Sequence, residues 1–404
     1  PILIGVQKGL SGSESVIRYA QTELGAGNDI WPTVLPLVGG RVALVHMICG
    51  IVIPLFVVAV MTRFFGVNRS WHEGLRIWRF ALFASLAMTI PSTIIANTLG
   101  PEFPSLIGAL VGLAVTVPAA RRGWLLPKEP AWDFAKADTW PADWNGNVDI
   151  RLKHSDHKLS IFRSWLPYLL IAVLLVLTRL PALPLGDWLK SVTIPSNASL
   201  TENLFGSSVS VKPVAPLYLP GALFVLVCLM TVPMHRMSRK AAVVATKRSM
   251  RMVVSASLAL LFAVPMVQVF INSGGGDAGY DSMPKVLAGG VSSMVGGAWP
   301  LLSPLVGGLG AFVAGSNTIS NMMFSLFQFQ VGQNIGVDPL WIVALQAVGG
   351  AAGNTICVHN VVAACAVVGL VGREGDIIRI TAMVFLYYVV VAGIVGMLVT
   401  SFAT

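Results

Sequence analysis

The feature that most constrains this chain is a series of apolar stretches, each about as long as a lipid bilayer is thick. They occupy residues 42–62, 78–98, 103–120, 164–180, 217–234, 252–271 and 380–402. A helix needs about 20 apolar residues to cross the hydrocarbon core of a bilayer. Only 11% of the residues are charged, whereas soluble domains carry about 25%. The sequence therefore predicts an all-α integral membrane protein, built as a polytopic helical bundle.

Residues 286–371 are also apolar, but glycines interrupt them repeatedly. A helix in a membrane can break only where its freed backbone groups are buried in protein or line a polar cavity. We therefore expect broken or re-entrant segments in this region, which precedes the last span.

Basic residues divide the connections between the apolar stretches into two sets. Arginine and lysine are abundant in the connections 63–79, 121–163 and 235–251. Few basic residues occur in the alternate connections 99–102, 181–216 and 272–285. Basic loops of membrane proteins tend to stay in the cytoplasm. We therefore predict that the first set is cytoplasmic and that both ends of the chain face outward.

Two polar clusters lie within the region broken by glycine. Their members are Gly315, Ser316, Asn317, Thr318, Ser320 and Asn321 in the first cluster, and Gly353, Asn354 and Thr355 in the second. The start of a helix carries a partial positive charge and free N–H groups, which bind anions. Many secondary transporters hold their substrate between two broken helices near the membrane midplane. We assign these residues to binding of a small carboxylate; the alternative is that they only hydrogen-bond helices together.

Three further residues, His359, Asn360 and Gln346, are candidates for coupling or supporting roles. Histidine titrates near neutral pH, which suits a group that carries a proton. A hydrogen bond from His359 to a neighbouring carbonyl would explain its presence equally well. His46, inside the first stretch, could belong to a relay, but we predict that it bonds a neighbouring helix. Arg41 is predicted to mark the outer end of the helix that contains His46.

Other kinds of chemistry are not indicated by the sequence. It contains no phosphate-binding loop, no zinc-ligand spacing and no arrangement typical of a Ser-His-Asp triad. The net charge of +9 is explained by basic cytoplasmic loops, and not by binding to nucleic acid. We therefore expect membrane lipid as a partner, and we expect no cofactor, no metal, no nucleic acid and no enzymatic reaction.

Several long motifs point to a known family. Gly315–Gln328 reads GSNTISNMMFSLFQ, Gln333–Val337 reads QNIGV, and Gly349–Glu374 reads GGAAGNTICVHNVVAACAVVGLVGRE. These motifs resemble the C-terminal part of the lactate permease family, whose members carry L-lactate, D-lactate and glycolate. GPEFP at 100–104 and RSWLPYLLIAVLLVLTRLP at 163–181 resemble the middle of the same family. The resemblance covers most of the chain and is strongest in 305–380.

The resemblance implies a symporter in a prokaryotic cell membrane that carries lactate, or a close 2-hydroxy monocarboxylate such as glycolate, together with a proton. It also implies an inverted-repeat-type transporter, of which this chain holds the second half and the tail of the first. Some members carry Pro-Gln in place of His359 and Asn360, so His359 is not an obligatory proton carrier for the family. A sodium-coupled transporter or a dicarboxylate transporter of related fold is the alternative.

On this interpretation residues 1–404 form a single transmembrane transporter domain, and we expect an N-terminal portion to be missing. Residues 1–120 would hold an outer segment and the first three spans, and 121–163 a cytoplasmic loop. Residues 164–285 would hold three spans with an outer loop at 181–216. Residues 286–404 would hold the glycine-rich substrate-site region and the last helix.

Overall fold

The computed structural model describes most of the chain. The described ranges are 2–128, 132–136, 139–141, 160–180, 183–194, 214–247, 279–368 and 372–402, with scattered positions between them. Within these ranges the regular structure is helical, apart from an isolated bridge between Ile194 and Val214. The chain divides into two compact units, residues 1–149 with 259–404, and residues 150–258.

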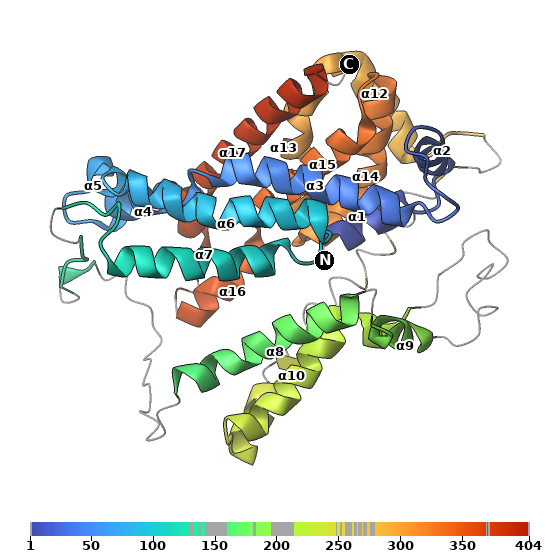
Figure 1. Cartoon of the computed structure of the whole chain (residues 1–404). Coiled ribbons are helices and arrows are strands. Elements are labelled where there is room, and N and C mark those ends of the chain that lie inside the picture. The colour runs from blue at the N-terminus through green and yellow to red at the C-terminus, as the bar shows by residue number, and fades with distance from the viewer. Residues whose placement is uncertain are drawn as a thin grey trace. The chain divides into compact units, whose positions relative to one another are not determined.

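The larger unit contains most of the helices (Figure 1). Its first part consists of α1 (Ile2–Leu10), α2 (Glu14–Thr22), α3 (Trp31–Gly50), α4 (Ile53–Phe65), α5 (Trp71–Leu75), α6 (Trp78–Thr98) and α7 (Pro104–Arg121). Its second part consists of α12 (Met283–Val295), η6 (Gly296–Ala298), α13 (Trp299–Ala314), α14 (Asn317–Asn334), α15 (Pro339–Gly353), α16 (Val358–Val368) and α17 (Glu374–Phe402). The smaller unit contains α8 (Ile161–Arg179), α9 (Leu185–Ser191), η5 (Pro216–Tyr218) and α10 (Pro220–Met234).

Seven segments of the described chain are long and apolar enough to cross a membrane. They are Trp31–Phe65, Trp78–Thr98, Pro104–Arg121, Ile161–Arg179, Met283–Ala314, Pro339–Cys365 and Glu374–Phe402. Five of the predicted spans coincide with these segments, and a sixth, 217–234, corresponds to the shorter α10. The predicted span 252–271 lies mostly outside the described residues. The prediction of an all-α, multi-pass membrane protein is confirmed.

The first membrane segment is longer than predicted and is interrupted. Because α3 begins at Trp31, Arg41 lies in the middle of a helix, and the prediction that it marks the helix end is wrong. Arg41 does lie level with the end of α6, since the adjacent Gly40 packs on Asn97. The break before α4 is followed by Pro54, which lacks the N–H needed for a backbone hydrogen bond to the preceding turn.

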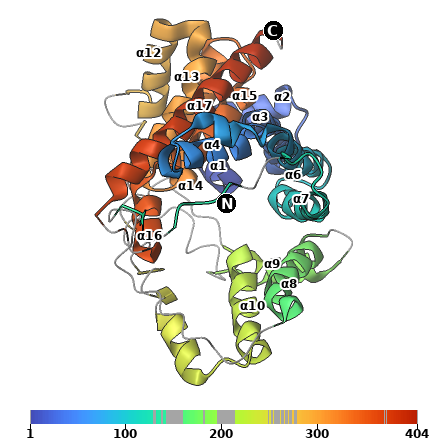
Figure 2. The same ribbon diagram turned by 90° about the vertical axis from the view of Figure 1, so that its left-hand side faces the viewer.

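Three layers of helices can be followed in the first part of the larger unit. Helix α3 packs on α6, and α6 packs along α7. Figure 2 shows α6 and α7 nearly end-on and side by side, as expected for consecutive helices joined by a short connection. This pair lies on the far side of α3 from α15, which α3 also contacts.

Close backbone contacts hold the second part together. A Cβ atom added to Gly307 on α13 would lie 2.2 Å from the carbonyl oxygen of Gln346 on α15. One added to Gly349 on α15 would lie 1.9 Å from the carbonyl oxygen of Pro304. In membranes, where lipid is as apolar as leucine, such small residues let helices approach closely and gain packing energy. Helices α13 and α15 therefore pack backbone to backbone.

The short helix α1 packs in the same way on the start of α14. Cβ atoms added to Gly5 and Gly9 would lie 2.4 Å and 2.7 Å from the carbonyl oxygens of Thr318 and Asn321. Apolar side chains around Phe329 and Leu340 fill the space between α1, α2, α3 and the α14–α15 pair. Helix α1 thus packs against the backbone of the first polar cluster.

Candidate functional site

The first polar cluster lies at a break between two helices. Helix α13 ends at Ala314, and Gly315 has a left-handed backbone with φ of 72°. Glycine suits this position because other residues adopt positive φ only at a steric cost. Helix α14 begins at Asn317, and the side chain of Ser316 does not cap it. The first-turn N–H groups of α14 therefore have neither an intrahelical partner nor a side-chain cap from Ser316.

The second cluster lies at a second break, between α15 and α16. Helix α15 ends at Gly353 and α16 begins at Val358. Between them the chain makes a tight turn, in which the N–H of Ile356 bonds the carbonyl of Gly353. The side-chain amide of Asn360 donates to the carbonyl oxygen of Asn354 at 3.3 Å. This break therefore also ends in a helix start with free N–H groups.

The two breaks meet in space. A Cβ atom added to Gly315 would lie 2.6 Å from Nδ1 of His359, so the imidazole packs directly on the first break. The side-chain oxygen of Asn317 packs on Gly350, one turn before the second break. The positive ends of two helix dipoles, those of α14 and α16, thus lie near one another. This is the arrangement expected of an anion site between broken helices.

A ladder of buried side-chain hydrogen bonds connects α13, α14 and α15 below the breaks. The indole N–H of Trp299 donates to Gln328 at 2.8 Å, and the amide of Gln328 donates to Gln346 at 3.0 Å. Gln346 donates to the hydroxyl of Ser320 at 3.0 Å, and Ser320 donates to the carbonyl of Gly307 at 2.8 Å. Both glutamines and Ser320 are fully buried. Since an unpaired buried polar group is costly, this ladder fixes the three helices in one arrangement.

Two asparagines one turn apart complete the first cluster. The amide of Asn321 donates to the side-chain oxygen of Asn317 at 3.1 Å, and Asn317 donates to the carbonyl of Ala347 at 3.5 Å. The side-chain oxygen of Asn321 and the hydroxyl of Ser325 are buried and find no partner among the described residues. Buried polar atoms of this kind are usually satisfied by water or a ligand.

The predicted site residues range from exposed to buried. Thr355, His359 and Asn360 are exposed, and Gly315, Ser316, Thr318 and Asn354 are half-buried. Asn317, Ser320, Asn321, Gln346 and Gly353 are buried. Gln346 bonds Gln328 and Ser320 within the ladder, and its coupling or supporting role stays a prediction. For the other residues, binding of substrate stays a prediction.

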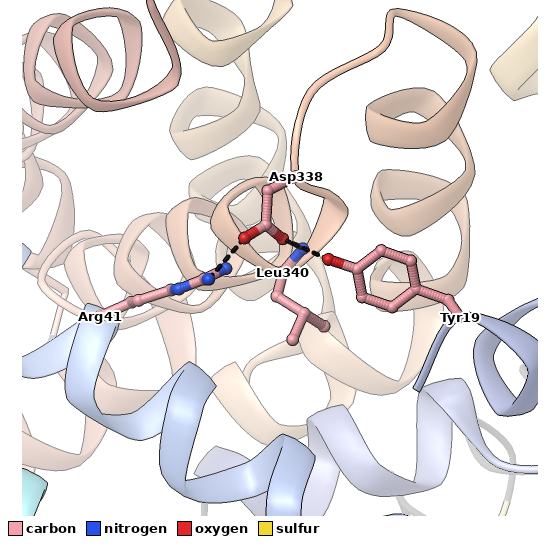
Figure 3. Close-up of polar contacts among 4 residues, drawn as sticks. All are labelled: Tyr19, Arg41, Asp338 and Leu340. Atoms are coloured by element: carbon pink, nitrogen blue, oxygen red, sulfur yellow. Dashed lines mark hydrogen bonds and ion pairs between the residues drawn. The ribbon is translucent and has the colours of Figure 1, made fainter. Parts of the chain in front are cut away.

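The sequence analysis missed a polar cluster at the opposite end of α15 (Figure 3). Arg41 pairs with Oδ2 of Asp338 at 2.5 Å, and the hydroxyl of Tyr19 donates to Oδ1 at 3.0 Å. Oδ1 also accepts the N–H of Leu340 at 2.9 Å, which makes Asp338 the N-cap of α15. The available signal was the Asp-Pro pair, since an acidic cap followed by proline often starts a helix.

The electrostatics of this cluster follow from its partners. Burial by itself raises the pKa of Asp338, but the hydrogen bond and charge of Arg41 outweigh it, helped by Leu340 and Tyr19. The net effect holds the pKa of Asp338 below its usual value. Burial and the adjacent Asp338 carboxylate raise the pKa of the Tyr19 phenol. Asp338 is therefore a carboxylate and Tyr19 a neutral donor at neutral pH.

His46 and Tyr388 form a second pair of polar residues between helices. The ring Nδ1 of His46 on α3 lies 2.5 Å from the hydroxyl of Tyr388 on α17. The prediction that His46 bonds a neighbouring helix is therefore confirmed. Beside it, the hydroxyl of Tyr387 donates to the carbonyl of Cys49 at 3.0 Å. These contacts join the first and last membrane segments of the described chain.

Comparison with known proteins places these features in context. The pattern that defines the L-lactate permease family matches residues 28–402. The chain is 24% identical to the L-lactate permease of Escherichia coli K12, over 85% of this chain and 62% of that protein. It is 25% identical to the L-lactate permease of Bacillus subtilis, over 81% of this chain and 59% of that protein. It is 27% identical to the glycolate permease of E. coli K12, over 86% of this chain and 62% of that protein. No solved structure matches the chain.

Proposed function

The chain belongs to the L-lactate permease family, and from this premise we propose that it is part of a proton symporter for lactate, glycolate or another small 2-hydroxy monocarboxylate. The names of the relatives support the substrate class, since they are permeases for L-lactate and for glycolate. The chain spans about 62% of the length of these two relatives. The proposal therefore concerns the full-length protein and not this chain alone.

The convergence of two helix starts is the observation that carries the proposal. Backbone N–H groups at the starts of α14 and α16 have no intrahelical partners, and both starts border the contact between Gly315 and His359. A carboxylate can accept several such N–H bonds, and each helix start adds a partial positive charge. Asn317 and Thr318 in the first turn of α14 add side-chain hydrogen-bond donors for the carboxylate. A monocarboxylate can thus be held without a fixed positive charge at the breaks.

The membrane segments contain few groups that could carry further protons. Apart from Glu374 and Asp376 at the start of α17, the seven candidate spans hold no acidic residue. One proton moving with one monocarboxylate transfers no net charge. Membrane potential contributes about 2.3 kcal/mol per charge per 100 mV, so it would then contribute nothing to accumulation. We propose that the pH gradient and the substrate gradient alone drive transport.

Vesicles containing the full-length protein test this proposal. An imposed pH difference, acid outside, should drive lactate uptake, and a potential set by potassium and valinomycin at equal pH should not. Uptake driven by potential alone would contradict one-to-one proton symport. Replacing choline by sodium in the same vesicles tests the sodium-coupled alternative, which requires that sodium increase uptake at equal pH. Absence of lactate and glycolate uptake under every condition would refute the substrate class.

A further inference from the structure

A cleft beside Arg41 carries an inference about a second site. We propose that this cleft is a peripheral binding site for a small carboxylate, at which Asp338 competes with the incoming anion for Arg41. This inference depends on the proposed function in one respect only, the class of ligand, which is a small carboxylate. The site lies at the far end of α15 from the helix breaks, about 20 Å away at 1.5 Å per residue.

The cleft has the size and lining of a small-anion site. Its volume is about 310 Å³, and it lies between α3, α6 and α15. Arg41, Thr93, Asn97 and Trp341 supply its polar and aromatic lining, and aliphatic side chains of α3 complete it. The guanidinium carbon of Arg41 lies 4.9 Å from the centre of the Trp341 ring, which holds the side chain in place from one face. A carboxylate of a few heavy atoms fits this space with room for water.

Arg41 has more hydrogen-bond donors than the described protein satisfies. Its Nη2 bonds Asp338, whereas its Nη1 is buried and finds no partner among the described residues. A guanidinium presents five N–H donors in a fork that matches a carboxylate. The side chain is 17% exposed and lines the cleft, so its guanidinium needs only a small side-chain rotation to meet an anion there. The unpartnered nitrogen is the observation that points to a ligand, because a buried charged donor without an acceptor is costly.

Asp338 makes binding at this site dependent on pH. An anion on Arg41 places a second negative charge beside the Asp338 carboxylate, and like charges favour its protonated form. The groups that act on Asp338 are Arg41 from α3 and Tyr19 from α2, and Glu23, just after α2, acts on Tyr19. Helices α13, α14 and α15 carry no titratable side chain, and the one on α1, Lys8, is exposed. The affinity for the anion therefore rises as pH falls.

Charge is balanced in this exchange. The empty site holds a guanidinium cation and the Asp338 carboxylate, with no net charge. The loaded site holds the guanidinium cation, the bound anion and a neutral Asp338 carboxylic acid that has gained one proton from water. No net charge is added, so one anion and one proton occupy the site together.

Binding of L-lactate to the purified full-length protein tests the proposal. The background is Asn317→Ala, which disables the site proposed at the helix breaks, and binding is followed calorimetrically at neutral and mildly acidic pH. Asp338→Asn should bind lactate about tenfold or more tightly at neutral pH, because a charge next to a carboxyl group shifts its pKa by about one to three units and the variant removes this interaction. Its affinity should also lose the pH dependence. Asparagine still caps α15, so the helix start is kept.

The double variant Arg41→Gln with Asp338→Asn should lose this binding without leaving a buried charge unpaired. Asp281→Asn, which removes the acid of an exposed ion pair with Lys285, is the matched control and should bind like the parent. Weaker binding by Asp338→Asn, or unchanged binding by the double variant, would overturn the proposal. If chloride bound as tightly as lactate and displaced it, a site specific for carboxylates would be refuted. Lactate uptake by the wild type, measured separately, reports on the proposed function whichever way these outcomes fall.

Discussion

The backbone contact between α13 and α15 predicts opposite outcomes for one substitution at two glycines. A Cβ atom added to Gly349 would lie 1.9 Å from the carbonyl oxygen of Pro304, so the helices must separate by more than 1 Å to relieve the overlap. Overpacking of this kind costs about 1–3 kcal/mol. Gly289 on α12 has no atom within 4 Å of the same position. There alanine should stabilise its helix by up to about 1 kcal/mol.

Thermal unfolding of the purified full-length protein and lactate uptake into vesicles measure both outcomes. Gly349→Ala should melt at a lower temperature and lose most uptake, because separation of α13 and α15 moves the start of α14 away from the second break. Gly289→Ala should melt at the same temperature or higher and transport normally. If Gly349→Ala melts and transports like the wild type, the close approach of α13 and α15 is wrong.

Four further substitutions test other parts of the structure. Asn317→Ala and Thr318→Val should each reduce uptake roughly ten- to a hundredfold with normal membrane insertion, because a hydrogen bond to a charged group is worth about 1.5–3 kcal/mol; normal uptake by both would reduce the cluster to helix packing. Gln346→Leu removes a hydrogen-bond partner of both Gln328 and Ser320, and it should lower the free energy of unfolding by about 1–3 kcal/mol. Gln333→Leu on the exposed side of α14 serves as its control, and equal stability of the two variants would argue against the ladder. Because the pKa of Asp338 is lowered in the fold, its ion pair stabilises the protein above the ordinary carboxyl pKa of about 4, and this stability should disappear as the pH falls below that value. A melting temperature with the same acid dependence in wild type and Asp338→Asn would contradict the assignment.

The membrane segments could be predicted because each one is a run of consecutive apolar residues. Runs without charge, such as 78–98, have a single physical explanation in a lipid bilayer. The start of α3 could not be found in this way, since Arg41 and two prolines, Pro32 and Pro36, make the segment from Trp31 look like a loop. Helix α14 was not predicted as a separate apolar helix for a related reason, because its asparagines and glutamines lower its mean hydropathy.

The helix breaks could also be predicted, whereas their partners could not. Gly315 and Gly353 stand in polar clusters within apolar sequence, and a break is the usual way to satisfy such groups in a membrane. The ion pair of Arg41 with Asp338 joins positions 297 residues apart. No periodicity or local motif reports a contact at that separation. The same holds for Gln328 and Gln346, which read as isolated polar residues until α14 and α15 are packed together.

Protection of Thr355 by substrate is the most direct test of the central claim, that the two helix breaks form the carboxylate site. Thr355→Cys introduces a thiol at an exposed position of the second break. The full-length protein would carry it in a background without Cys228, the exposed native cysteine. Saturating L-lactate should slow alkylation of this thiol by a maleimide, and Asn317→Ala should abolish the protection. A control thiol at Ser191→Cys on α9 should react at the same rate with and without lactate. An unchanged rate at position 355, in protein that still transports lactate, would contradict the claim.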